Sequence, residues 1–263
     1  MSNSVRHTKS GRLAEKVCVI TGATSGFGLA IARLFASEGA SLVLNGQRND
    51  IGQSVAQELR RSGADAYFVR GDVGLSDTAR AIVASARENF GRIDSLVLNA
   101  GIANLALGPF WEISEDDYDK LFTVNVRGVW LCARAAVPLL TPGSTIVVMA
   151  SVSSFRAHQG EATYCASKGA VLQLARGMSA DLADRGVRVN ALCPGICDTP
   201  LTRWFIERSE DPKKTESEYA FAASMRRMGT SAEIARAALF LASDESTFTT
   251  GASLVCDGGQ TIG

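Results

Sequence analysis

The sequence predicts an α/β fold built on a parallel β-sheet that is buried on both faces. Short apolar runs rich in β-branched residues alternate with longer segments of helical periodicity, which is the order of repeated strand–helix–strand units. The apolar runs lack the alternation typical of half-buried strands, and this indicates cover on both faces. Glycines stand between several of the expected helices and strands, where helices commonly end.

The elements follow one another in a regular order from the first strand onward. The expected strands are Val17–Thr21, Ser41–Leu44, Ala66–Val69, Ser95–Leu98, Thr145–Met149, Val187–Leu192 and Ser253–Cys256. The expected helices are Gly28–Glu38, Ile51–Arg61, Asp77–Asn89, Glu115–Leu140, Thr163–Ala183 and Ala232–Ala242. Residues 196–230 break the rhythm as a long connection, of the kind that forms lids or is disordered. We therefore expect a flexible arm over residues 1–13 and one domain over residues 14–263.

Composition and charge exclude several classes of protein. The 263 residues carry 27 basic and 27 acidic side chains without a basic block, so neither nucleic acid nor an anionic membrane is an expected partner. Six cysteines without a Cys-x-x-Cys pair and only two histidines predict no metal site and fit a reducing cytoplasm. Residues 1–13 do not resemble a secretory signal, and the apolar segment Val129–Leu140 is too short to span a bilayer.

The first expected strand runs into a glycine-rich turn that leads directly into a helix. Glycines there let the backbone approach a pyrophosphate, and the free N–H groups at the helix start favour anions. The spacing is Gly-x3-Gly-x-Gly, and a glycine-rich turn without a ligand is the alternative interpretation. The candidate cofactor contacts in this turn are Gly22, Thr24, Ser25, Gly26, Phe27 and Gly28.

The end of the second strand bears on the choice of cofactor. In NAD sites an acidic residue at this point accepts a hydrogen bond from the ribose 2′-hydroxyl, but the stretch Leu44-Asn45-Gly46-Gln47-Arg48 carries no carboxylate. Arg48, with Gln47 beside it, would instead meet the 2′-phosphate of NADP. A solvated Arg48 is the alternative.

Three other strand ends carry candidate cofactor contacts, because ligands of open α/β sheets bind beyond the carboxyl ends of the strands. Asp72, followed by Val73, would meet the adenine amino group or cap the next helix. The remaining candidates are Asn99, Ala100 and Gly101 after the fourth strand, and Pro194, Gly195 and Thr199 after the sixth.

Tyr164 and Lys168 stand four residues apart in an expected helix and so share a face. An ammonium beside a phenol favours the phenolate and would lower a tyrosine pKa from its usual value of about 10. Such a tyrosine exchanges a proton with an alcohol or carbonyl oxygen near neutral pH, which is acid/base chemistry suited to hydride transfer. For the pair alone, two side chains on a solvated helix face are the alternative.

Ser151 and Asn125 complete the set of catalytic candidates. Ser151 follows the fifth expected strand, where its hydroxyl would donate to a developing oxyanion, and Ser153 and Ser154 compete with it by position. Asn125 interrupts an apolar helical stretch, and a buried amide is costly unless it is hydrogen-bonded. It would bind a water molecule or a backbone group.

In this order and spacing, these residues resemble the short-chain dehydrogenase/reductase family over roughly residues 14–260. The resemblance implies a Rossmann-type, doubly wound parallel sheet of about seven strands with helices on both faces, usually in a homotetramer. The motifs that carry it are Thr21-Gly22-x3-Gly26-x-Gly28, Asp72, Asn99-Ala100-Gly101, Asn125, Ser151, Tyr164-x3-Lys168, Pro194-Gly195 and Asp257-Gly258-Gly259.

The resemblance also implies an Asn125–Ser151–Tyr164–Lys168 tetrad. Tyr164 would be the acid/base, and Lys168 would lower its pKa and hold the nicotinamide ribose. Ser151, favoured over the neighbouring serines by its spacing to Tyr164, would polarise the substrate oxygen. Asn125 would hold a water molecule that links Lys168 to a proton relay, and Thr199 would bind the carboxamide of the cofactor.

The implied activity is NAD(P)-dependent interconversion of a secondary alcohol and a ketone. Arg48 favours NADP, but Ser25 and Gln47 stand where NADP-dependent relatives often carry basic residues, so NADP and NAD both stay open. Residues 197–228 would form a substrate lid, with Trp204, Phe205 and Phe221 as apolar contacts and Ser153 as a polar one. Packing at a subunit interface is the alternative for the aromatic residues, and a hydrophobic or cyclic substrate is expected.

Two other functions remain as alternatives at this point. A 3-oxoacyl-carrier-protein reductase has the same tetrad and would dock an acidic carrier, with Arg127, Arg156 and Arg176 as candidates. A nucleotide-sensing module without catalysis is a remote alternative, because such proteins usually lack the tyrosine or the lysine.

Overall fold

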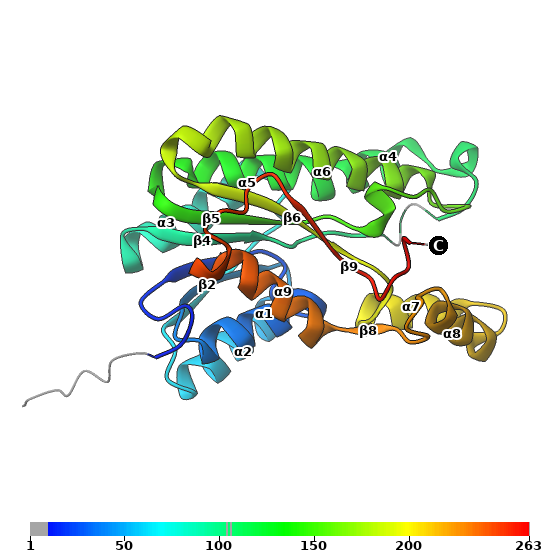
Figure 1. Cartoon of the computed structure of the whole chain (residues 1–263), viewed down its shortest axis with the longest axis horizontal. Helices are drawn as coiled ribbons and strands as arrows, with labels where there is room; N and C mark the ends of the chain where they lie inside the picture. Colours follow the sequence, from blue (N-terminus) through cyan, green and yellow to red (C-terminus); the bar gives the residue numbers. More distant parts are fainter. Residues whose placement is uncertain (1–9, 104, 106, 263) are drawn as a thin grey trace, which may run out of the picture.

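A seven-stranded parallel sheet forms the centre of the computed structural model, which describes residues 10–103, 105 and 107–262 (Figure 1). The strand order is β3-β2-β1-β4-β5-β6-β9. The chain thus starts in the middle of the sheet, winds to one edge, returns, and winds to the other. This doubly wound order confirms the expected fold, and its crossover point lies between β1 and β4.

All seven apolar runs that were expected to be strands are strands. β5 begins earlier than expected, at Leu140 instead of Thr145. The strand bounds are β1 Val17–Ile20, β2 Ser41–Gly46, β3 Ala66–Arg70, β4 Ile93–Leu98, β5 Leu140–Met149, β6 Arg188–Pro194 and β9 Ser253–Cys256.

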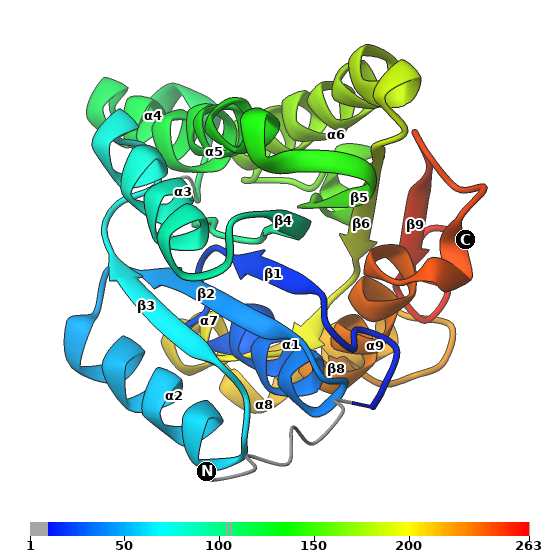
Figure 2. The ribbon, with the colours of Figure 1, turned by 90° about the vertical axis from the view of Figure 1, so that its left-hand side faces the viewer.

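Helices cover the sheet on both sides, as Figure 2 shows. One layer holds α1 (Gly26–Ser37), α2 (Asn49–Arg61) and α9 (Ser231–Ala242). The other layer holds α3 (Ser76–Phe90), α4 (Glu115–Phe122), α5 (Gly128–Ala136) and α6 (Ala162–Leu182).

Each face of the sheet carries its own apolar core, and successive strand residues point into opposite cores. In β4, Val97 packs on the α1 side, whereas Leu96 and Leu98 pack on the α6 side. Every residue of β1 and β6 is buried for the same reason. This arrangement explains why the strands read as continuous apolar runs.

A π-helical turn at Thr123–Arg127 interrupts the helix expected over Glu115–Leu140. α4 precedes this turn and α5 follows it. Asn125 lies in the turn with 1% of its surface exposed. Such turns are rare inside helices and frequently occur at functional sites.

Residues 196–230 contain two helices where the sequence suggested an irregular connection. They are α7 (Pro200–Arg208) and α8 (Pro212–Phe221). Each begins with proline as its first residue, and the side chains of Thr199 and Asp211 accept hydrogen bonds from the first turns. The short strands β7 (Cys197–Asp198) and β8 (Gly229–Thr230) pair and join the two ends of the excursion.

The packed part of the chain starts earlier than the expected boundary at residue 14. Leu13 is fully buried, and its N–H donates to the Glu38 carbonyl at 2.9 Å. Arg12 pairs with the Glu38 carboxylate at 2.8 Å. The expected arm of residues 1–13 is therefore wrong for Arg12 and Leu13, and its residues 1–9 lie outside the described part of the chain.

Two further findings bear on the compositional expectations. Within the described residues, no helix has the length and apolarity that crossing a bilayer requires. All six cysteines, which fall in the described ranges, are free thiols.

Candidate active site

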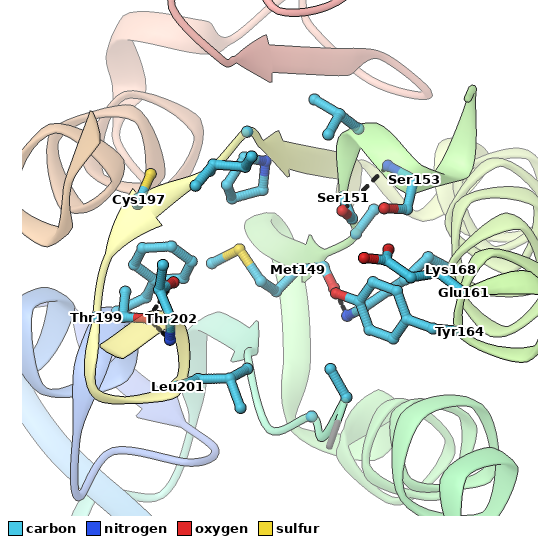
Figure 3. Close-up of a pocket in the computed structure, with 18 of the residues that line it drawn as sticks. Met149, Ser151, Ser153, Glu161, Tyr164, Lys168, Cys197, Thr199, Leu201 and Thr202 are labelled. Carbon is cyan, nitrogen blue, oxygen red and sulfur yellow. Dashed lines mark hydrogen bonds between the residues drawn. The ribbon is translucent and has the colours of Figure 1, made fainter. Parts of the chain in front are cut away.

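A cavity of about 320 Å³ opens at the carboxyl ends of β4, β5 and β6 (Figure 3). Doubly wound sheets bind their ligands at this edge, near the crossover point. Ser151, Tyr164 and Lys168 all line the cavity, although they come from the end of β5 and from α6. The fold therefore brings three of the four expected catalytic side chains into one space.

Tyr164 and Lys168 lie one turn apart in the first half of α6. The Lys168 ammonium lies 5.9 Å from the centre of the Tyr164 ring and donates to the Met149 carbonyl at 2.9 Å. The lysine side chain is 5% exposed. The predicted shared face is confirmed, and Met149 fixes the ammonium at the end of β5.

The pKa of Tyr164 differs from the expectation drawn from its spacing to Lys168. Burial raises the pKa of Tyr164 to about 12, and a hydrogen bond with Ser151 only partly opposes this. Burial also lowers the pKa of Lys168 to about 8, because the charged form loses its hydration. The pKa is thus raised where the spacing to Lys168 predicted that it would be lowered, and a phenol with this pKa is protonated near pH 7.

The three candidate serines have different partners. The Ser151 side chain accepts a hydrogen bond from the Ser153 N–H at 3.1 Å and also bonds with Tyr164. The Ser154 hydroxyl donates to the Lys168 carbonyl at 2.8 Å, which ties it to the backbone of α6. Ser151 is therefore the candidate serine whose hydroxyl lies beside the Tyr164 phenol.

Asn125 braces the site through its amide. Its oxygen accepts from the Ile102 N–H at 2.8 Å, and its nitrogen donates to the Ile102 carbonyl at 2.9 Å and to Ser167 at 3.2 Å. The Ser167 hydroxyl donates in turn to the Tyr164 carbonyl at 2.8 Å. Asn125 does not line the cavity, and its expected contact with a water molecule stays a prediction.

The glycine turn leaves the start of α1 open to an anion. Gly28 has no space for a side chain, because a Cβ there would lie 2.2 Å from the Gly22 carbonyl oxygen. The Asn99 side chain holds the turn by donating to the Thr21 and Gly22 carbonyls at 3.0 and 3.2 Å. The first turn of α1 carries no acidic residue, and the Ser25 side chain makes no capping hydrogen bond. These features fit a bound pyrophosphate.

The end of β2 joins this turn through Thr24. A Cβ on Gly46 would lie 2.6 Å from the Thr24 methyl group, so a larger side chain at position 46 requires the Thr24 side chain to shift. The Arg48 guanidinium donates to the Thr24 carbonyl at 3.2 Å and lies near its hydroxyl at 3.4 Å. Gln47 and Arg48 are exposed. The cationic side chain thus lies over the outer end of the glycine turn.

Asp72 and Val73 already have partners within the protein. The Asp72 carboxylate pairs with the Lys120 ammonium at 2.6 Å and accepts from the Gly74 N–H at 2.9 Å. Burial opposes ionisation, but these two hydrogen bonds keep the pKa of Asp72 below its usual value. Val73 is buried and lies against Gly128 in the core. Their contact with a cofactor stays a prediction.

The other expected cofactor residues lie on both sides of the cavity. Ala100 packs against the core beside the cavity, and Thr199 both lines the cavity and caps α7, where it accepts from the Thr202 N–H at 3.2 Å. The expected cofactor residues that line the cavity are Phe27, Asn99, Gly101, Tyr164, Lys168, Pro194, Gly195 and Thr199.

The expected lid, residues 197–228, supplies fewer substrate contacts than the sequence suggested. Phe205 of the lid lines the cavity, and so does Ser153, which lies after β5. Trp204 lies outside the lining, packs edge-on against Phe205 with ring centres 5.0 Å apart, and lies under Arg208. Phe221 is 59% exposed and also lies outside the lining.

Sequence reasoning missed several polar residues that line the cavity. Glu161 stands three residues before Tyr164, so helical spacing alone could have placed it on the same side of α6. The sequence carried no signal that His158, Tyr219 and Gln260 would line the same cavity, because they come from separate segments. The missed residues are His158, Glu161, Tyr219 and Gln260.

Comparisons with known proteins match nearly the whole chain. A family model described as enoyl-(acyl carrier protein) reductase matches residues 22–261. Oxidoreductase UcpA of Salmonella typhimurium is 39% identical over 257 residues, covering 96% of this chain and 97% of the relative. The 2-(R)-hydroxypropyl-CoM dehydrogenase of Xanthobacter autotrophicus is 38% identical over 94% of this chain and 99% of its own length. The 2,5-dichloro-2,5-cyclohexadiene-1,4-diol dehydrogenase LinX of Sphingobium indicum is 37% identical over 97% and 99%.

Proposed function

The chain belongs to the short-chain dehydrogenase/reductase family and is an NAD(P)-dependent oxidoreductase of alcohol groups, and we propose that it interconverts a secondary alcohol and a ketone. The observation that carries this proposal is the meeting of Ser151, Tyr164 and Lys168 in one cavity. The cofactor supplies the hydride acceptor or donor. The protein must therefore bind the cofactor, orient the substrate oxygen and move one proton.

In the reducing direction, Tyr164 gives its proton to the oxygen of the forming alcohol. Its pKa of about 12 keeps the phenol protonated at neutral pH, so the donor is ready. The Ser151 hydroxyl hydrogen-bonds the same oxygen and stabilises its developing negative charge. The Lys168 ammonium stabilises the phenolate that remains, since its pKa of about 8 leaves it mostly protonated at pH 7. Alcohol oxidation runs through the same groups in reverse.

The substrate that fits this site best is a small hydrophobic or cyclic alcohol. Apolar side chains from three segments line the cavity, among them Ile102, Leu107, Met149, Ile196 and Phe205. Two relatives are named as dehydrogenases of 2-(R)-hydroxypropyl-CoM and of 2,5-dichloro-2,5-cyclohexadiene-1,4-diol, and both printed names describe substrates that carry hydroxyl groups.

Acyl-carrier-protein chemistry has less support. The three arginines suggested for carrier docking lie on different segments, and Arg127 and Arg156 donate to the backbone carbonyls of Gly74 and Gln260. Arg176 lies far along α6 beside Ser253. All three guanidinium groups therefore already have hydrogen-bond partners within the protein.

A screen of cyclic and linear secondary alcohols and ketones, with an acyl thioester as comparison, tests the reaction. Turnover is followed at the absorbance of the reduced nicotinamide.

We expect Tyr164→Phe to lose nearly all turnover but to bind cofactor with unchanged affinity. The phenyl ring keeps the packing, and only the proton donor is removed. A variant that kept more than about a tenth of the wild-type kcat, a barrier change below about 1.4 kcal/mol, would contradict the acid/base role.

NADP is the proposed preferred cofactor. Arg48 lies over the glycine turn, and position 46 carries a glycine packed closely against the Thr24 methyl group instead of the acidic residue that NAD sites carry near the end of this strand. Arg48→Ala should therefore raise the KM for NADP about tenfold or more while changing that for NAD little, because one charge-assisted contact is lost. Arg61→Ala, at the far end of α2, is the matched control. Equal effects of Arg48→Ala on both cofactors would exclude a contact with the 2′-phosphate.

A further inference from the structure

A polar corner of the cavity is not used by the reaction described above. It consists of four residues that line the cavity. His158 and Glu161 lie just before α6, Ser153 lies in the turn after β5, and Tyr219 lies on α8. We call these four residues the Glu161 corner. Because one member comes from the lid and three come from the catalytic side, the corner forms only when both parts of the cavity wall are together.

The Glu161 carboxylate is an acceptor with spare capacity. Within the described residues, no side-chain hydrogen bond of Glu161 is found, and its main electrostatic neighbour is His158. Burial raises the pKa of this carboxyl, and His158 partly opposes the rise. Glu161 lines the cavity, and Figure 3 shows its carboxylate on the Tyr164 side of the cavity, close enough to raise the pKa of the phenol. A half-buried carboxylate that accepts no hydrogen bond costs free energy, so a ligand that donates a hydrogen bond to it is favoured.

The position of Glu161 relative to Tyr164 decides which part of a substrate it can reach. Glu161 is the N-cap residue of α6, just before the turn that carries Tyr164, and its carboxylate is close enough to raise the pKa of the Tyr164 phenol. Ser151 and Tyr164 hold the reacting oxygen in the proposed function. Glu161 therefore meets a different substituent of the same molecule, a few bonds away from the reacting carbon.

The charges in the cavity select the nature of that substituent. Among the described residues that line the cavity, Glu161 is the only acidic one. Its negative charge would repel a sulfonate, phosphate or carboxylate group on the substrate. An ammonium group would be repelled by the buried Lys168 and would cost much more to desolvate than a neutral donor. A hydroxyl group avoids both penalties and can donate to the carboxylate.

We propose that this enzyme acts on alcohols that carry a second hydroxyl group, which donates a hydrogen bond to Glu161. The inference rests on the proposed alcohol–ketone function and adds the substrate class. Ser153 and Tyr219 also offer hydroxyls to the same substituent. Diols and hydroxyketones, cyclic ones included, are the substrates of this description.

Calorimetric titration in the presence of NADPH tests the inference, because a reduced cofactor cannot oxidise the added alcohol. The probes are cyclohexanol, the isomers of cyclohexane-1,2-, 1,3- and 1,4-diol, and 4-aminocyclohexanol. We expect at least one diol to bind about tenfold more tightly than cyclohexanol, as one hydrogen bond to a charged group can provide. Glu161→Ala should remove this preference, and Glu161→Gln, which keeps an acceptor oxygen, should keep part of it. Glu207→Ala, on the exposed side of α7, is the control that should behave as wild type.

Three results would overturn the inference. Wild-type protein would bind no diol more tightly than cyclohexanol, or the preference would survive in Glu161→Ala, or 4-aminocyclohexanol would bind more tightly than every diol. Thermal melting of each variant excludes loss of folding as the cause. Oxidation of cyclohexanol by the wild-type enzyme with oxidised cofactor tests the alcohol–ketone function separately, so failure of the one proposal is distinguishable from failure of the other.

Discussion

Burial moves the pKa values of Tyr164 and Lys168 in opposite directions. The pKa of Tyr164 rises to about 12 and the pKa of Lys168 falls to about 8, because each residue loses the hydration of its charged form. A lysine that keeps its proton at pH 7 and loses it only slightly above is suited to stabilising a phenolate during turnover. The same shift makes the stability of the protein depend on pH.

Replacing Lys168 with methionine should change how stability varies with pH. Between about pH 8 and 10, unfolded lysine, with a pKa of 10.5, binds more protons than the buried Lys168, so wild-type stability gains from rising pH. Lys168→Met lacks this gain, which is on the order of 1 to 3 kcal/mol over the window. Denaturant unfolding at pH 8.0 and 9.5 measures it, and differences between variants cancel the titration of the other groups. Lys213→Met, an exposed lysine on α8, is the control, and identical pH slopes for wild type and Lys168→Met would refute a depressed lysine pKa.

At the scale of elements, one arginine joins the parts of the lid. Arg203 on α7 binds the Asp198 carboxylate with two contacts of 2.7 Å and the Glu216 carboxylate of α8 at 2.5 Å. β7, α7 and α8 are thereby linked, and Phe205 and Tyr219 are carried on these two helices. The network positions the lid wall of the cavity.

Arg203→Ala should raise the KM for substrate several-fold while kcat changes by less than about twofold, since the lid wall binds substrate but does not move the proton. Limited proteolysis should cut the Arg203→Ala variant faster than the wild type between residues 209 and 228.

Arg33→Ala is the control, because it removes a comparable two-contact pair with Glu58, at 2.8 and 2.9 Å, outside the lid. Both pairs are exposed, so we expect neither loss to change the stability of the protein much. Equal KM changes in the two variants would show that Arg203 does not act through the lid.

The sequence predicted the elements whose signals are local. Apolar runs located all seven strands, and spacing placed Tyr164 and Lys168 on one face of α6. It missed α7 and α8, although proline after Thr199 and after Asp211 is a helix-start signal, because the many charges there obscured any apolar face. It also missed the raised pKa of Tyr164 and the Glu161 corner, since burial depends on which distant segments come together.

At the scale of the whole molecule, the described surface keeps large apolar side chains exposed. Tyr118 on α4 and Trp130 on α5 are 46% and 45% exposed. Val255 on the edge strand β9 and Ile262 near the chain end are 38% and 83% exposed. Where exposed apolar groups gather into one patch, the patch is typical of a surface that binds another subunit.

The homotetramer implied by the family resemblance remains a prediction. Light scattering coupled to size exclusion should give about 111 kDa, four times the chain mass of 27.8 kDa. Trp130→Glu should lower that mass while circular dichroism stays unchanged, because a charge would be buried at a subunit contact. Leu75→Glu, on the loop before α3, is the control. A wild-type mass of 28 kDa would contradict the tetramer.

The contact between Thr24 and Gly46 restricts how the cofactor preference of this lineage can change. With a Cβ at position 46 only 2.6 Å from the threonine methyl, an acidic residue there requires the Thr24 side chain to move or position 24 to change. We therefore expect the two positions to be epistatic, so that the order of substitutions affects how well an intermediate along the mutational path folds. A library that varies position 46 alone should yield few active variants, whereas one that varies both positions together opens a route to the other cofactor.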